Sequence, residues 1–126
     1  MRLNIDCIRD IMFEVEKLQF NQVLEFNELV EKLPTYTPDE LAYTTIKLNE
    51  AGLLLATISN TYAGTLVSTL DDLTYSGHLF IADVRSDNIW GKTKSILAKL
   101  GSESIPIVSR VASTLMAEFI SKQINL

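Results

Sequence analysis

The sequence predicts an α+β protein that is mainly helical, with one small β-sheet. Three observations support this fold class. Apolar residues recur at helical spacings of three and four near both ends of the chain. Thr37, Pro38 and Glu40 match an N-cap, a first helical residue and the third position of a capping box. Two β-rich runs, 53–59 and 65–70, follow the helix that these residues begin.

Composition limits the classes of protein to consider. At 126 residues the chain has the length of one domain with an appendage, and 47% hydrophobic with 21% charged residues is typical of a folded protein. Cys7 and His78 are the single members of their types, so we expect neither a disulfide nor a zinc site. No apolar stretch is long enough to span a membrane, and no signal-peptide core begins the chain, so we expect a cytoplasmic protein.

Charge is distributed unevenly along the chain. Residues 1–84 hold 5 Lys and Arg against 13 Asp and Glu, a net charge of −8, whereas residues 85–126 hold 6 against 3, a net charge of +3. Nonspecific affinity for nucleic acids comes mainly from cations that neutralise phosphates. The first two thirds of the chain is therefore poorly suited to that contact.

The first elements follow from caps and periodicity. We expect Asn4 or Asp6 to cap an amphipathic helix, whose core-facing residues are Ile5, Ile8, Ile11, Met12, Val15 and Leu18. Residues 22–26 alternate polar and apolar side chains, which predicts a short strand. Asn27 is then expected to cap a brief helix through Lys32, which Pro34 stops.

The central helix ends at Ala51-Gly52, because glycine best tolerates the left-handed conformation that follows a helix. A helix, a glycine turn, a strand, a loop and a strand in this order resemble the second half of a winged helix-turn-helix domain. The loop contains Asn60 and Gly64.

Three helices are predicted after the hairpin. Thr74 is the expected N-cap of the first, and Gly77 is expected in its first turn, where this helix crosses the hairpin closely. Asp87 or Asn88 caps the second, from Ile89 to about Leu100, and Gly101 stops it. The last helix is expected to have Ser104 as its cap and Pro106 in its first turn, where a missing N–H does no harm.

Three segments carry a closer resemblance. They are 2–11 (RLNIDCIRDI), 49–54 (NEAGLL) and 73–94, of which LTYSGH and VRSDNIWGKTK are the most specific parts. Together they resemble an uncharacterised family of small phage and prophage proteins of Gram-positive bacteria. The resemblance implies a phage-related origin and a winged-helix core, and it supplies no catalytic residues. We expect a winged helix-turn-helix domain over 1–86 and a helical, dimerising extension over 87–126.

Enzyme chemistry has no support in the sequence. No GxGxxG, P-loop, HExxH, GxSxG or EF-hand spacing occurs, and His78 has no identifiable nucleophile beside it. We therefore expect no catalytic residue, no metal and no cofactor, and we interpret the protein as one that acts by binding.

The central helix is the element that would read DNA in a helix-turn-helix protein. With Leu41, Thr45 and Leu48 facing inward, Lys47 is the one cation on its outward side, and Asp39 and Glu40 stand at its start. Charge thus favours a protein partner, while DNA binding by a transcriptional regulator remains the alternative. The predicted contact residues for either partner are Tyr36, Tyr43, Thr44, Ile46, Lys47 and Tyr62.

A third hypothesis places nucleic-acid contact on the helix after Asn88. Lys92, Lys94 and Lys99 lie on it beside Trp90. A solvated face is the more common role of such lysines.

The last helix has an unusually wide apolar band. Its apolar pairs recur every four residues, so the band drifts by about 40° at each step and covers roughly 220°. One neighbouring surface cannot cover so wide a band, which favours a homodimer over a groove within the chain. The predicted dimerisation residues are Ile107, Val108, Val111, Leu115 and Phe119.

Overall fold

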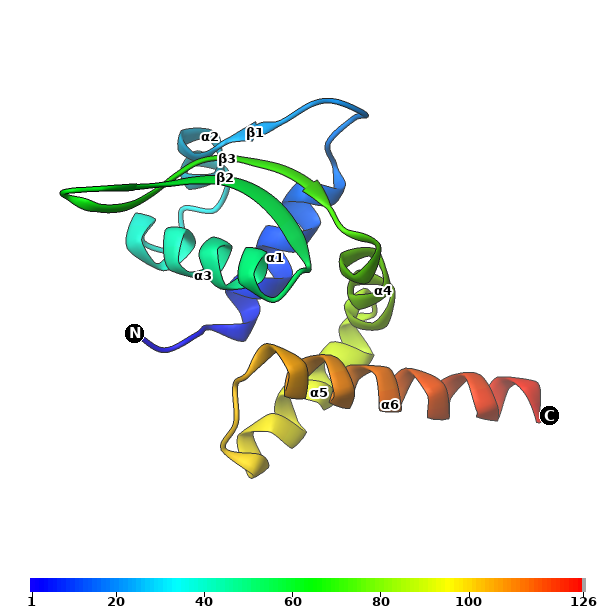
Figure 1. Cartoon of the computed structure of the whole chain (residues 1–126). Helices are drawn as coiled ribbons and strands as arrows, with labels where there is room; N and C mark the ends of the chain where they lie inside the picture. The colour runs from blue at the N-terminus through cyan, green and yellow to red at the C-terminus, as the bar shows by residue number, and fades with distance from the viewer. Residues whose placement is uncertain (126) are drawn as a thin grey trace. The chain divides into compact units, whose positions relative to one another are not determined.

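The computed structural model describes residues 1–125, and within them it has an α+β fold of six helices and one three-stranded antiparallel sheet (Figure 1). The elements in chain order are α1 (Ile5–Glu16), β1 (Leu24–Glu25), α2 (Phe26–Lys32), α3 (Pro38–Glu50), β2 (Leu54–Thr61), β3 (Gly64–Leu73), α4 (Tyr75–Val84), α5 (Asp87–Leu100) and α6 (Ile105–Ile124). The α+β class expected from the sequence is confirmed.

Two compact units divide the chain. Unit 1 comprises Met1–His78 and unit 2 comprises Leu79–Leu126. This division falls inside α4, whereas the sequence suggested a boundary after residue 86. Unit 1 contains the sheet and the first three helices, and unit 2 contains most of α4 with α5 and α6.

The N-terminal helix of unit 1 begins where its cap predicts. The Asn4 side chain accepts hydrogen bonds from the backbone N–H groups of Asp6 and Cys7, at 3.0 and 3.4 Å. The predicted inward residues Ile8, Ile11, Met12 and Val15 are buried, together with Cys7. This helix therefore supplies one side of the core of unit 1.

Helix α3 also begins as predicted. The Glu40 N–H donates to the Thr37 hydroxyl at 3.1 Å, and Pro38 occupies the first turn. The Glu40 carboxylate accepts from the Asn4 side chain at 3.3 Å, which ties α3 to the cap of α1. Leu41, Thr45 and Leu48 are fully buried, as expected.

The sheet has the order β1-β3-β2. Strand β1 is shorter than the predicted 22–26 strand, and it pairs Leu24 with Leu70 and Glu25 with Thr69. Helix α2 begins at Phe26 with Glu25 as its N-cap residue, so the expected cap at Asn27 is wrong. Helices α1 and α3 both contact the sheet, and their shared core contains Leu54, Leu70 and Leu73 among its buried side chains.

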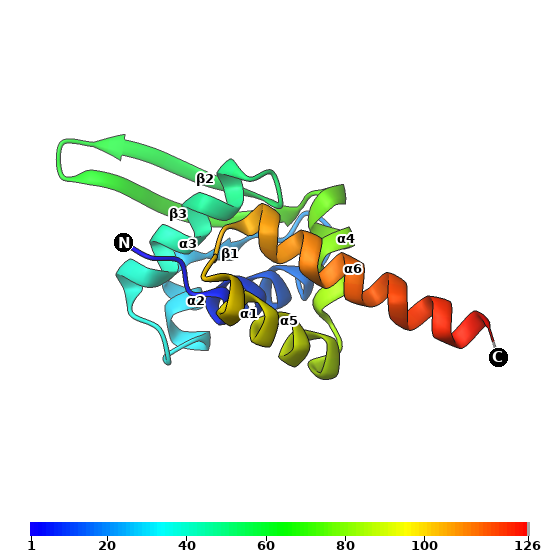
Figure 2. The ribbon, with the colours of Figure 1, turned by 90° about the horizontal axis from the view of Figure 1, so that it is seen from below.

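The β2–β3 hairpin is longer than the sequence suggested. Its strands extend to Thr61 and from Gly64, leaving only Tyr62 and Ala63 in the turn. The Thr61 hydroxyl donates to the Gly64 carbonyl at 2.8 Å, and Gly64 has a φ of +122°, which other residues rarely adopt. The end of the hairpin extends beyond the helices of unit 1 in both views (Figures 1 and 2).

The hairpin is held at its base by the start of α4. The Thr74 N–H donates to the Leu53 carbonyl at 3.2 Å, and its hydroxyl donates to the Gly52 carbonyl at 2.6 Å. The Gly77 N–H donates to the Thr74 hydroxyl at 3.0 Å, which confirms the predicted cap.

In unit 2, α5 and α6 pack against each other. The Ile89 N–H donates to the Ser86 hydroxyl at 3.3 Å, so Ser86 is the cap of α5 rather than Asp87 or Asn88. Gly101 ends the helix in the left-handed conformation, with a φ of +68°, as predicted. Trp90, Leu97 and Val108 are buried.

Candidate functional site

The outward side of α3 carries three of the predicted contact residues. Tyr43, Ile46 and Lys47 are each partly exposed. The Lys47 ammonium lies 2.9 Å from a Glu50 carboxylate oxygen and 5.4 Å from the centre of the Tyr43 ring. The hydrogen bond that the Lys47 ammonium donates to the Glu50 carboxylate raises the pKa of Lys47. The cation of this surface is therefore already paired with a carboxylate of the same helix.

The N-terminal end of α3 is acidic. Asp39 is exposed and Glu40 partly exposed in its first turn. Carboxylates are favourable beside the positive end of a helix dipole, so they stabilise α3 itself. They also repel phosphates, and unit 1 as a whole carries 5 Lys and Arg against 12 Asp and Glu.

Two predicted contact residues do not reach the surface. Tyr36 is only 8% exposed, and its hydroxyl donates to a carboxylate oxygen of Asp10 at 2.6 Å. Thr44 is 1% exposed, and its hydroxyl donates to the Glu40 carbonyl at 2.7 Å. The expectation that these side chains are exposed is wrong, because α1 packs along this side of α3.

Tyr62 lies at the turn of the β2–β3 hairpin and is fully exposed. Leu55 and Leu66, at 54% and 55%, are exposed on the strands behind it. The hairpin thus presents apolar side chains on a segment that carries no charged residue between 51 and 70.

Cys7 is not available for chemistry in the folded chain. Its side chain is completely buried in α1. Burial raises the pKa of the thiol to about 11, the nearby Glu40 and Asp10 carboxylates add to the rise, and a hydrogen bond with Thr44 opposes it. Because the thiolate is the nucleophilic form, this cysteine is a packing residue.

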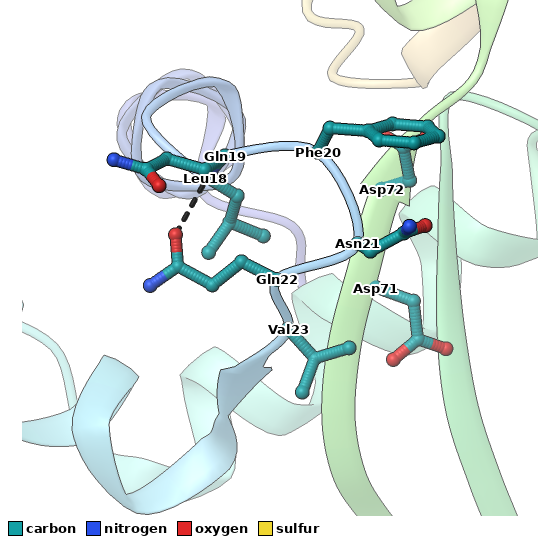
Figure 3. Close-up of a pocket in the computed structure, with 8 residues that line it drawn as sticks. All are labelled: Leu18, Gln19, Phe20, Asn21, Gln22, Val23, Asp71 and Asp72. Atoms are coloured by element: carbon teal, nitrogen blue, oxygen red, sulfur yellow. Dashed lines mark hydrogen bonds between the residues drawn. The ribbon is translucent and has the colours of Figure 1, made fainter.

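A hollow of about 330 Å³ lies between the loop after α1 and the end of β3 (Figure 3). Its lining comes from 18–23 together with Asp71 and Asp72. Phe20 is 94% exposed, and the loop is held by the Gln19 N–H donating to the Gln22 side chain at 2.9 Å. Asp71 accepts from the hydroxyls of Thr57 and Thr69, at 2.8 and 2.5 Å, so its carboxylate is engaged with the sheet.

Metal ligands do not gather anywhere in the described part of the chain. Within residues 1–125, no group of three or more His, Cys, Asp and Glu side chains is placed to hold an ion. None of the helices described in this range has the length and apolar character needed to cross a bilayer.

The three lysines of α5 differ in exposure. Lys92 and Lys99 are exposed, whereas Lys94 is partly buried. Lys92 also lines a hollow of about 310 Å³ between α5 and α6, with Phe119 and Lys122. The predicted basic surface is therefore interrupted by apolar residues and by Glu118 from α6.

Helix α6 has an apolar surface on its second half. Val108 is completely buried within the chain, so its assignment to a dimer contact is wrong. Ile107, Val111 and Leu115 are partly exposed, and Phe119 is 47% exposed. The prediction omitted Ile120 and Ile124, which are 48% and 75% exposed. Both continue the four-residue spacing, which could have identified them.

Within residues 1–125 the structure is thus an α+β fold of six helices and one three-stranded antiparallel sheet. A family model described as hypothetical protein (DUF2513) matches residues 2–103. The chain therefore belongs to this family, which confirms the expectation of an uncharacterised family. No curated protein and no solved structure matches the chain. The family match ends before α6 begins.

Proposed function

We propose that unit 1 is a winged helix-turn-helix module in a non-enzymatic, cytoplasmic protein of phage or prophage origin that acts by binding another protein. The fold part rests on the element order α1-β1-α2-α3-β2-β3 and on the sheet order β1-β3-β2. The phage-related origin rests on the resemblance of the LTYSGH and VRSDNIWGKTK segments. Fold alone does not decide function, so the partner is argued from the surface.

The pairing of Lys47 with Glu50 carries the choice of a protein partner. Docking α3 against phosphates would first require this ion pair to open, and Asp39 would then face the same anions. A protein partner can contact α3 while the Lys47–Glu50 ion pair stays closed. Partly exposed aromatic and aliphatic side chains such as Tyr43 and Ile46 are common at the centres of protein interfaces.

Site-specific photocrosslinking tests this surface in the infected or lysogenic host. A photoreactive residue in place of Ile46 should give a discrete protein adduct, whereas the same residue in place of the exposed Glu31 on α2 should not. Equal adduct patterns from the two positions would contradict a protein-binding role for α3.

DNA binding is the second candidate, because the same element order occurs in DNA-binding winged-helix regulators. Under that function α3 would enter the major groove, with Tyr43 and Lys47 as its contacts. A mobility-shift experiment with mixed duplex at low salt separates the two functions. We expect no shift at micromolar protein. A shift that Lys47→Ala abolishes would support the regulator, and one that requires Lys92 and Lys99 would move the contact to α5.

We further propose that the protein is a homodimer through the second half of α6. Phe119, Ile120 and Ile124 are exposed there, whereas Val108 in the first half of the helix is buried. Leaving this much apolar surface in water on one helix is unfavourable, and a second α6 offers a surface of the same character.

Light scattering tests this dimer. The double variant Ile120→Lys, Ile124→Lys should behave as a smaller species than the unmodified chain. Thr114→Lys, Ser121→Lys is the matched control, because it adds the same charge at exposed positions on another side of α6. Equal masses for both variants and the unmodified chain would overturn the proposal.

A further inference from the structure

Strand β2 forms one edge of the sheet, since the strand order is β1-β3-β2. Two register shifts interrupt its pairing with β3: Leu55 pairs with Asp72 but Ala56 with Leu70, and Thr57 pairs with Thr69 but Ile58 with Val67. In both cases the extra residue, Asp71 or Ser68, belongs to β3. The edge strand itself is therefore free of bulges from Leu54 to Thr61.

One side-chain contact reveals which backbone groups face outward from this edge. The Ala56 N–H donates to the Asn49 side chain of α3 at 3.0 Å rather than to β3. Because successive residues of a strand direct their N–H and C=O groups to opposite edges, Ile58 and Asn60 share the direction of Ala56. The N–H groups of Ile58 and Asn60 therefore face outward from the edge, closer to the hairpin turn than the Ala56 N–H that Asn49 binds.

The usual protection of an edge strand is missing here. Natural edges carry charged side chains, prolines or bulges that prevent pairing with another strand. Residues 51–70 contain no charged residue and no proline. In a chain with a net charge of −5, residues 51–70 of this hairpin bring no carboxylate of their own to such a contact, and the neighbouring Asp71 carboxylate is engaged by the hydroxyls of Thr57 and Thr69.

We propose that β2 pairs in antiparallel fashion with β2 of a second copy of this chain. The two-fold axis passes at Ser59, so that Ile58 of each copy exchanges backbone hydrogen bonds with Asn60 of the other. Asn49 sets this register, because it occupies the Ala56 N–H and prevents pairing from extending further toward the base of the hairpin. The contact joins the two three-stranded sheets edge to edge.

This contact is independent of the proposed α6 dimer and of the partner of α3. If both the β2 contact and the α6 contact form, dimers are linked into larger assemblies. A dimer joined through α6 still has two free β2 edges, and a dimer joined through β2 still has two free α6 surfaces. The experiments are therefore done in the Ile120→Lys, Ile124→Lys background, where the α6 contact is disrupted.

Amide hydrogen exchange by NMR gives the first test. Exchange of the Ile58 and Asn60 amides should slow about tenfold as the protein is concentrated, because pairing covers groups that are otherwise open to water. The Ala56 amide is the internal control, since Asn49 binds it in every copy. Rates at Ile58 and Asn60 that do not change with concentration, or that change only as much as the rate at Ala56, would overturn the proposal.

Sedimentation of charge variants gives the second test. Ser59→Lys places like charges opposite each other at the two-fold axis and should abolish association. Ser68→Lys is the matched control, because Ser68 is exposed on β3 away from the edge, and it should associate as the background protein does. Equal association of the two variants would contradict the β2 contact even if the α6 dimer were correct.

Discussion

The backbone of Gly77 lies directly against the carbonyl of Leu53. A Cβ atom at position 77 would lie 2.0 Å from the Leu53 oxygen and 3.2 Å from the end of the Met12 side chain. The start of α4, the base of the hairpin and α1 therefore meet at a point where only a hydrogen fits. The sequence placed Gly77 at such a crossing, and the structure confirms it.

Gly77→Ala should lower the free energy of unfolding by about 2 to 3 kcal/mol, because backbone rather than a flexible side chain must move. Gly91→Ala is the matched control in α5, where nothing lies within 4 Å of the added methyl group. It should raise stability by up to about 1 kcal/mol through helix propensity. Urea denaturation measures both, and changes of the same sign would contradict the close approach.

Tyr36→Phe should cost about 1 to 2 kcal/mol of stability, because it removes a short hydrogen bond from a buried hydroxyl to the Asp10 carboxylate. Tyr75→Phe, at a residue that is 79% exposed, should leave stability unchanged. Chemical denaturation of the two variants at neutral pH makes the comparison. Equal effects would mean that the Tyr36 hydrogen bond does not support the fold.

The Cys7 thiol should make the protein less stable as the pH rises above about 9. In the folded chain burial raises the pKa of the thiol to about 11, whereas the unfolded chain loses the proton near the reference value of 9.0. Deprotonation of the unfolded chain therefore lowers the free energy of unfolding as the pH rises from about 9 to about 11. The loss is about 2 to 3 kcal/mol at the upper end of this range.

Denaturation at several pH values between neutral and about 10 measures this effect, with Cys7→Ala as the reference that lacks the thiol. The reference should lose less stability over the same range. Tyr36 also has a raised pKa, mainly through burial and the Asp10 hydrogen bond, which both proteins retain, while the charge of Cys7 adds to the rise only in the unmodified chain. Parallel pH profiles would show that Cys7 does not titrate as proposed.

Thr45→Val should stabilise the protein by about 1 kcal/mol, because the Thr45 hydroxyl is buried without a hydrogen-bond partner among the described residues. Thr44→Val is the matched control in the same helix. Its hydroxyl donates to the Glu40 carbonyl, so its replacement should not stabilise. Thermal unfolding of both variants decides between them, and a loss of stability for Thr45→Val would contradict the assignment.

Local signals in the sequence predicted the helices well. Asn4, Thr37 and Thr74 each accept the N-terminal hydrogen bond that their positions suggested, because a cap is a contact within a few residues. The hairpin was predicted too short, since its ends depend on pairing between strands and not on composition alone.

The candidate site was harder to predict than the fold. Periodicity identified Leu41, Thr45 and Leu48 as one buried side of α3, but it could not reveal that α1 covers a second side and buries Thr44. Similarly, the apolar band on α6 did not show which of its residues are covered within the chain, so Val108 was assigned to the dimer contact although it is completely buried. Such errors arise wherever a tertiary neighbour sets the width of a buried face.

Tryptophan and tyrosine are segregated between the two units. The lone tryptophan, Trp90, is buried in unit 2, whereas all four tyrosines lie in unit 1. Tryptophan emission therefore follows the helical C-terminal part, and tyrosine absorbance follows the part that contains the sheet. A single unlabelled sample can thus report whether the two parts melt together or one after the other.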